Sequence, residues 1–212
     1  MKNEHLGDIQ EQRLIDDKSE RTQHMDLKTQ IRTSSIIGMA SAGLWLIALF
    51  IEYRYGLQPP GNGSLIYLVD QILFFIALGG YLIMLLGLWK SKAAGDGIFG
   101  KIALGIFIAA LVALLIAWLA QLWKKDPNLF LYPVGGIFQL IGGLLTAIAV
   151  VTAKRWNGWQ KYAPLLQGLY YLIVLFLPIV ISNQSPTQLS ESLWQVTWFI
   201  TSLALFTKSS NT

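Results

Sequence analysis

The chain contains no cysteine, and its only two histidines, His5 and His24, lie within the first 33 residues. Disulfides, thiolate metal sites and covalent haem attachment are therefore excluded. The rest of the chain also lacks the imidazole on which haem ligation, histidine metal sites and Ser-His dyads depend. We therefore predict no metal site and no cofactor.

Charged residues are scarce, at 13% of 212 residues, whereas soluble domains carry about 25%. Seven of the twelve acidic residues and six of the sixteen basic residues fall within residues 1–33, so the remainder is almost free of charge. Because a charge that faces lipid is costly, this distribution predicts a protein in contact with membrane lipids. The net charge is +4, but the basic residues flank apolar segments, so this charge does not indicate a nucleic-acid partner.

Motifs for catalysis are missing as well. The sequence has no Gly-rich loop ending in Gly-Lys-Ser/Thr and no H-E-x-x-H motif. Only Asp70 lies well inside an apolar segment, whereas an aspartyl intramembrane protease needs two facing carboxylates. We predict that the chain is not an enzyme.

Six apolar segments approach or exceed the roughly 20 residues that a helix needs to cross a bilayer. They cover residues 34–52, 65–89, 98–123, 133–153, 164–182 and 186–207. The sixth is the most polar, but Ser185, Pro186 and Gln188 predict a capped helix start. We expect an all-α, six-helix transmembrane bundle over residues 34–208. A cytoplasmic tail, residues 1–33, precedes it, partly disordered at its start and helical where it enters the first span.

Lysine and arginine residues in the short connections predict the orientation of this bundle. The N-terminal tail, the second and fourth connections and the C-terminal end together carry 13 of these residues, and the opposite side carries 3. Both termini are therefore expected in the cytoplasm. Aromatic residues flank the spans at both ends, and we expect them, Trp194 included, to anchor the helices at the membrane interfaces.

The second and fourth spans resemble each other. Residues 75–82 and 138–145 share an aromatic residue, a Gly-Gly pair and a leucine at the same spacing, with an offset of 63 residues. Parallel duplications of this kind occur in some transporters. The alternative is that each Gly-Gly pair arose independently, and small residues at such spacings serve close helix packing.

Polar side chains from four predicted helices fall at a similar depth near the outer side: Asp70, Gln71, Gln121, Gln139 and Gln195. An intramembrane carboxylate predicts a functional site. We therefore hypothesise a solute or proton site around Asp70. The alternative is that Asp70 pairs with Arg54 or Lys124, or reaches interfacial water.

Basic and aromatic residues also gather in the fourth connection: Lys154, Arg155, Trp156, Trp159 and Lys161. We interpret them as interfacial anchors, and a lipid-headgroup site is the alternative. The pattern Arg155-Trp156-x-Gly158-Trp159, followed by Pro164-Leu165-x-x-Gly168-Leu169, resembles an inner loop of several groups of uncharacterised bacterial multi-pass membrane proteins. The resemblance implies a location in the bacterial inner (plasma) membrane and implies no activity.

Two functions remain open. The first, which we favour from the sequence, is a non-catalytic subunit or regulator of a membrane complex, in contact with another membrane protein or a second copy of itself. Short connections and few intramembrane polar groups support it. The alternative is a small transporter or solute-binding membrane protein that uses the polar cluster around Asp70.

Overall fold

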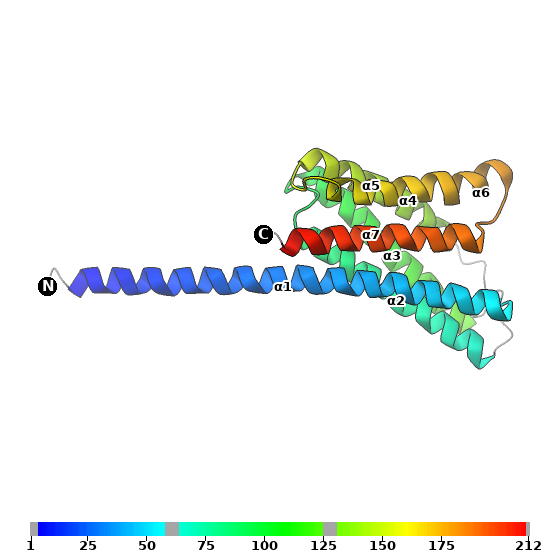
Figure 1. The fold of residues 1–212 in the computed structure, drawn as a ribbon, viewed down its shortest axis with the longest axis horizontal. Helices are drawn as coiled ribbons and strands as arrows, with labels where there is room; N and C mark the ends of the chain where they lie inside the picture. The colour runs from blue at the N-terminus through cyan, green and yellow to red at the C-terminus, as the bar shows by residue number, and fades with distance from the viewer. Residues whose placement is uncertain (1–3, 58–63, 125–130, 211–212) are drawn as a thin grey trace.

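The computed structural model describes residues 4–57, 64–124 and 131–210, and side-chain environments within residues 25–57, 64–120 and 133–209. Every regular element in these ranges is helical, as predicted (Figure 1). The elements are α1 (Glu4–Tyr55), α2 (Leu65–Lys90), α3 (Ile98–Lys124), α4 (Leu131–Ala153), η1 (Gln160–Tyr162), α5 (Ala163–Tyr170), η2 (Tyr171–Phe176), α6 (Leu177–Ser182) and α7 (Gln188–Ser210). The segments α5, η2 and α6 follow one another without a break and fill the fifth predicted span.

Five stretches of helix in the described residues are long and apolar enough to cross a membrane: Met25–Tyr55, Leu65–Lys90, Ile98–Ala120, Pro133–Ala153 and Gln160–Ser182. Their outward faces expose large apolar side chains such as Phe50, Ile116 and Ile173. Apolar exposure on this scale suits a lipid environment and not water. The sixth predicted segment forms α7, whose polar start keeps it outside this group of five.

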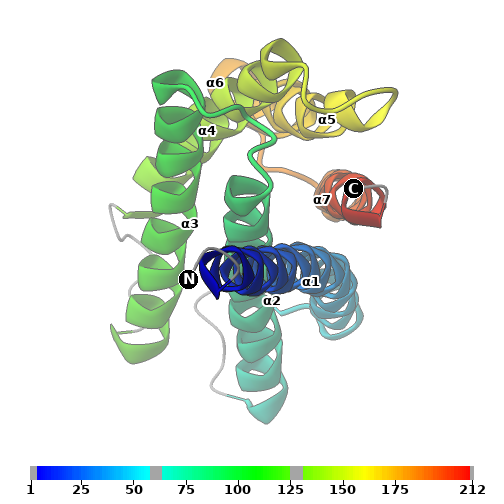
Figure 2. The ribbon, with the colours of Figure 1, turned by 90° about the vertical axis from the view of Figure 1, so that its left-hand side faces the viewer.

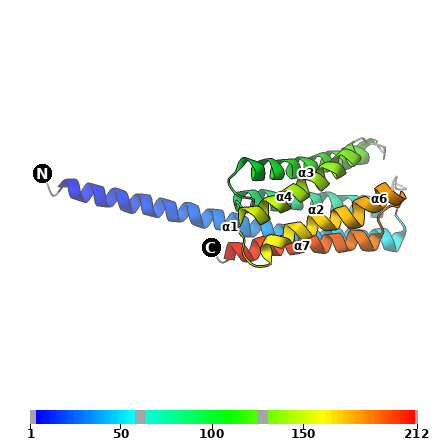
Figure 3. The ribbon, with the colours of Figure 1, turned by 90° about the horizontal axis from the view of Figure 1, so that it is seen from above.

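The helices form a closed ring. Each of α1, α2, α3, α4 and α5 packs against the next, and α7 packs against both α5 and α1 (Figure 2). The N-terminal part of α1 extends beyond the bundle as a single rod (Figures 1 and 3). We call the end of the bundle near the C-terminus the proximal end and the opposite end the distal end.

Small residues bring α1 and α2 into close contact. A Cβ atom built on Gly80 would overlap Ser41, and one built on Gly87 would overlap Ser34. Both pairs are seven residues apart on their own helices, so they repeat the same contact two turns along the antiparallel pair. Glycine at these two positions lets the backbones approach as helices in lipid require.

The glycine pairs of α4 serve two neighbours at once. A Cβ on Gly142 would lie 2.6 Å from the backbone of Phe107 in α3, whereas one on Gly143 would lie 3.7 Å from the Phe107 ring and 4.0 Å from Gly168 of α5. In α2 the equivalent of Gly142 is Gly79, which has no neighbouring atom within 4 Å. The matching glycines of the sequence repeat therefore make different contacts.

The start of α7 differs from the prediction. The hydroxyl of Thr187 accepts a hydrogen bond from the Ser190 backbone N–H at 3.2 Å, which makes Thr187 the N-cap in place of Ser185. The helix begins at Gln188 because Thr187 already supplies the acceptor for the first turn. At the end of the preceding helix, Asn183 closes α6 in the left-handed conformation, with φ 49°.

Candidate functional site

A cavity of about 410 Å³ lies inside the ring of helices. Each of α1, α2, α3, α4 and α7 contributes to its wall, and so does the continuation of α5 through η2 and α6. The lining residues are Trp45 and Glu52 from α1, Phe74 and Leu78 from α2, Leu114 and Trp118 from α3, Gln139 from α4, Tyr171, Leu175 and Phe176 from η2, Ile179 from α6, Pro186 from the connection, and Glu191 and Trp194 from α7.

Helical spacing directs these side chains inward. Trp45 and Glu52 are seven residues apart on α1, and Glu191 and Trp194 are three apart on α7, so each pair shares one helical face. In both pairs the carboxylate lies nearer the distal end and the tryptophan deeper in the bundle. The cavity therefore has an acidic distal part and an aromatic interior.

A π-helical segment forms one wall. It covers Tyr171–Phe176 and ends two residues before Pro178. Proline has no N–H to bond the preceding turn, and a wider turn accommodates that missing bond. The segment places Tyr171 and Leu175 against the cavity. Such π-bulges are frequent at functional sites in helical proteins.

The aromatic rings of the cavity form a connected wall. Trp45 lies 4.9 Å from Phe74 and 6.0 Å from Trp194, measured between ring centroids. Phe74 continues the contact to Trp118 at 5.2 Å, and Trp194 to Tyr171 at 5.3 Å. Trp194 is therefore a core residue, 7% exposed, and the prediction that it anchors the helix at the interface is wrong. Its ring is held by aromatic neighbours from α1 and η2.

Two carboxylates face the cavity without a cationic partner. Glu52 lies close enough to Asp70 and Glu191 for their charges to interact. Within the part of the chain whose side chains the structure describes, neither Glu52 nor Glu191 forms an ion pair. The distal half of the ring therefore gathers three acidic side chains in an apolar setting, where an ionised carboxylate and a cation attract each other more strongly than in water.

Several N–H donors at the cavity also have no hydrogen-bond partner among the described residues. They are Nε2 of Gln139 and the indole Nε1 atoms of Trp45 and Trp194. Gln139 is only 4% exposed. A buried donor without an acceptor is costly, and each such group needs an explanation. A molecule in the cavity with an acceptor atom supplies one.

The structure places the predicted site residues in three different surroundings. Gln139 lines the cavity. Asp70 and Gln71 are buried side by side, with Gln71 Nε2 donating to Asp70 Oδ2 at 3.1 Å, and Asp70 forms no ion pair among the described residues. Gln195 lies deeper, where its Oε1 accepts a hydrogen bond from the Tyr81 hydroxyl. The side chain of Gln121 lies outside the described residues.

Glu52 and Glu191 line the cavity and were not among the site residues predicted from the sequence. Both stand at the distal end of an apolar segment, where a single charge is easily taken for the membrane boundary. The available signal was their helical phase, since each shares a face with a tryptophan. That signal gains meaning only once α1 and α7 are known to be neighbours.

No metal centre is evident in the described part of the chain, where no three or more His, Cys, Asp or Glu residues are grouped to hold an ion. The carboxylates around the cavity thus do not form a coordination sphere. The wall is built mostly of aromatic and aliphatic side chains, which suit an organic molecule.

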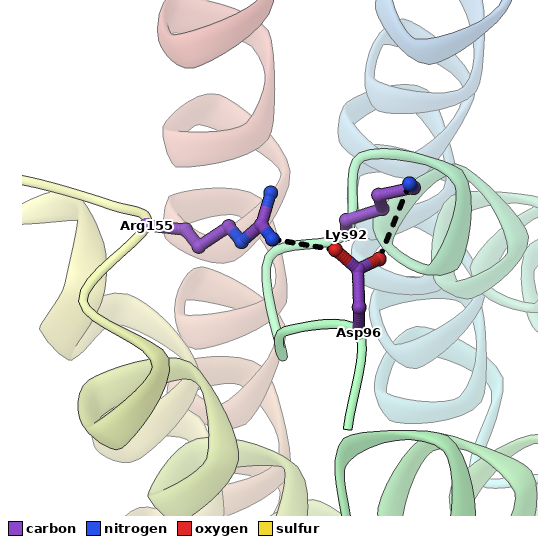
Figure 4. A network of polar contacts seen from close by, with 3 residues as sticks. All are labelled: Lys92, Asp96 and Arg155. Atoms are coloured by element: carbon purple, nitrogen blue, oxygen red, sulfur yellow. Dashed lines mark hydrogen bonds and ion pairs between the residues drawn. The ribbon is translucent and has the colours of Figure 1, made fainter. Parts of the chain in front are cut away.

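The residues of the proposed lipid-headgroup site lie at the proximal end. Arg155 donates to Asp96 at 2.5 Å, and Lys92 pairs with the same carboxylate at 3.2 Å (Figure 4). The hydrogen bond from Lys92 and the charge of Arg155 lower the pKa of Asp96. This three-residue cluster ties the connection after α2 to the connection after α4.

The remaining members of that group differ in exposure. Lys154 is exposed, and Lys161 lies with its Nζ 4.8 Å from the ring centroid of Tyr162. Trp159 is 47% exposed, whereas Trp156 is 2% exposed and belongs to the hydrophobic core. Burial thus removes the Trp156 ring from contact with a headgroup, and headgroup binding by the other four stays a prediction.

No protein-family model, curated protein or solved structure matches the chain.

Proposed function

We propose that this chain is a solute-binding membrane protein of the small-transporter class, with the central cavity as its binding site. One observation carries the proposal: α1, α2, α3, α4, α7 and the η2–α6 continuation of α5 all line one cavity. Its volume of about 410 Å³ falls within the range of about 300–1,000 Å³ that is typical of small-molecule sites. Apolar walls with a few polar groups are also typical of such sites.

The proposal includes six membrane crossings with both termini in the cytoplasm of a bacterial cell, in its inner membrane. The 23 residues of α7 give a length of about 35 Å, which suits a sixth crossing. The basic connections Lys90–Lys92 and Lys154–Lys161 share the proximal end. In this orientation the distal end, with Glu52 and Glu191, faces the outside.

Single-cysteine labelling tests this topology. The chain has no cysteine, so no native cysteine has to be replaced first. Ser185→Cys at the distal end should react with a membrane-impermeant maleimide in intact cells. Asn157→Cys at the proximal end should react only after the membrane is permeabilised. The reverse pattern would invert the orientation and place the cavity towards the cytoplasm.

The small-residue faces give less support to the subunit function than the sequence suggested. Gly80, Gly87 and Gly142 are occupied by contacts within the chain, against α1 and α3. They are therefore unavailable to a partner. A shared cavity, in contrast, needs no partner to explain it.

Native mass spectrometry of the protein in lipid nanodiscs tests solute binding. We expect the purified chain to retain a small molecule, or to bind one saturably from a mixed panel of amines, sugars, organic acids and peptides. Leu114→Trp, which fills the cavity, should abolish this binding. The matched control Val112→Trp places the same ring on the exposed side of α3 and should leave it intact. Equal binding by both variants would refute the cavity as the site.

The subunit or regulator function keeps one specific support. α1 continues from Glu4 to Tyr55, and its N-terminal part leaves the bundle with exposed positions such as Met25 and Leu27. Co-purification of a stoichiometric second polypeptide that is lost on deletion of residues 1–24 would support this function. A chain that elutes alone, with or without that segment, would remove it.

A further inference from the structure

We propose that the central cavity recognises an organic cation that also carries an uncharged hydrogen-bond acceptor. This inference rests on the solute-binding function proposed above and adds the chemical class of the solute. Three kinds of group in the cavity support it: carboxylates near the distal end, aromatic rings along the wall, and buried N–H donors further inside.

The acidic groups near the distal end favour a positively charged solute, because an ionised carboxylate without a nearby cation is costly in an apolar setting. Glu52 and Glu191 lie within electrostatic range of each other, and Asp70 adds a third acidic group nearby. No described lysine or arginine pairs with them. A cleft lined by charge of one sign between apolar walls focuses its field and attracts the opposite charge. A cationic solute therefore fits this part of the cavity.

The aromatic wall favours an organic cation over a metal ion. Calcium and magnesium need about six or more oxygen ligands in a defined geometry. Here the rings of Trp45, Phe74 and Trp194 lie deeper in the cavity than the carboxylates. The ring centroids of Phe74 and Trp194 lie 4.9 Å and 6.0 Å from that of Trp45. Ring faces attract ammonium groups by the cation–π interaction, and they bind the apolar body of an organic ion as well.

The buried donors add a requirement that a simple cation does not meet. Nε2 of Gln139 and Nε1 of Trp194 have no acceptor among the described residues, and both side chains are more than nine-tenths buried. A solute with an ester, amide, ether or hydroxyl oxygen satisfies them. A carboxylate on the solute would instead be repelled by the two glutamates, so the acceptor is uncharged.

Three probes of similar size separate these contributions. Acetylcholine carries both a cationic head and an acceptor. Its carbon isostere 3,3-dimethylbutyl acetate keeps the acceptor without the charge, and pentyltrimethylammonium keeps the charge without the acceptor. Dissociation constants are measured by tryptophan fluorescence titration of the full chain in nanodiscs. We expect acetylcholine to bind about tenfold more tightly than either of the other two.

Variants assign each contribution to its residues. Glu52→Gln with Glu191→Gln should weaken acetylcholine about tenfold and leave the uncharged isostere unchanged. Gln139→Leu should weaken acetylcholine about fivefold and leave pentyltrimethylammonium unchanged. Asp26→Asn removes one acidic charge far from the cavity and should change neither constant.

The outcomes distinguish the chemical class from the function itself. Equal affinity for acetylcholine and its uncharged isostere, or unchanged acetylcholine affinity in the double glutamine variant, would overturn the cation inference. The solute-binding function would still stand if Leu114→Trp abolishes the binding of a solute. No binding of any of the three probes would also overturn the class. Thermal unfolding of every variant, compared with the unsubstituted chain, confirms that lost binding reflects the site and not the fold.

Discussion

Replacing Gly80 by alanine tests how closely α1 and α2 are packed. The added Cβ would overlap the Ser41 hydroxyl and lie 3.1 Å from Ser41 Cβ and 3.2 Å from Ile37 Cγ2. The hydroxyl is fixed, because it donates to the Ile37 carbonyl at 2.8 Å in the same turn. Relief therefore requires either a new Ser41 rotamer without that bond or a shift of the two helices.

The expected cost follows from two opposing terms. Overpacking in a well-packed core costs about 1–3 kcal/mol. Alanine in place of glycine within a helix stabilises the folded chain by up to about 1 kcal/mol. Gly80→Ala should therefore lower the free energy of unfolding by roughly 1–2 kcal/mol.

The neighbouring glycine provides the control. A Cβ at Gly79 has no atom within 4 Å, so Gly79→Ala should keep or raise stability by up to about 1 kcal/mol. Ser41→Ala removes the overlapping hydroxyl, so combining it with Gly80→Ala should recover about 1–2 kcal/mol relative to the sum of the single changes. Equilibrium unfolding in mixed micelles of mild and denaturing detergent measures all four variants.

The result that would refute this account is specific. If Gly79→Ala and Gly80→Ala have the same effect, α1 does not pack on the Gly80 face of α2. If the double variant is no more stable than additivity predicts, Ser41 is not the residue that Gly80 accommodates. Either outcome would also remove the explanation given for the seven-residue spacing of the glycines.

Three further predictions concern other parts of the bundle. The pKa of Asp96 is lowered in the fold, so its ion pairs stabilise the chain at pH values above its usual pKa of 3.8, and this stabilisation is lost as the pH falls through the lowered pKa. The difference in melting temperature between the unsubstituted chain and Asp96→Asn should therefore shrink below about pH 4. A difference that stays constant with pH would contradict the ion pairs. Tyr81→Phe leaves the fully buried Gln195 without its donor and should cost about 1–3 kcal/mol in unfolding free energy, whereas a neutral change would show that the two side chains do not bond. Trp156→Ala should lower the free energy of unfolding by about 3–5 kcal/mol because the ring is in the core, whereas Trp159→Ala, at an exposed position, should lower it by less than about 1 kcal/mol. The reverse order would show that Trp156 lies at the surface and not in the core.

The positions of α2, α3 and α4 were readable from the sequence. The predicted spans 65–89, 98–123 and 133–153 match α2, α3 and α4 to within two residues at each end. This agreement has a local cause, since a run of about 20 apolar residues bounded by glycine, proline or charge determines a membrane helix by itself. Cap residues were less predictable, as the exchange of Ser185 for Thr187 at the start of α7 illustrates.

The candidate site was only partly readable. Gln139 was predicted and lies in the cavity, but Glu52 and Glu191 were not recognised, and Gln195 is engaged by Tyr81 outside the lining. Each of these outcomes depends on which helices are neighbours. The packing of α7 against both α1 and α5 closes the ring and brings Glu191 to the same cavity as Glu52.

The sequence by itself indicated an all-α chain with apolar helices long enough to cross a membrane, and it located α2, α3 and α4 to within two residues at each end. Only the tertiary structure decided which faces point inward, and so which of two tryptophans, Trp156 or Trp159, is buried. The reason is that lipid and protein interior are both apolar. A helix in a membrane therefore carries little of the amphipathic pattern that marks the buried face of a helix in water.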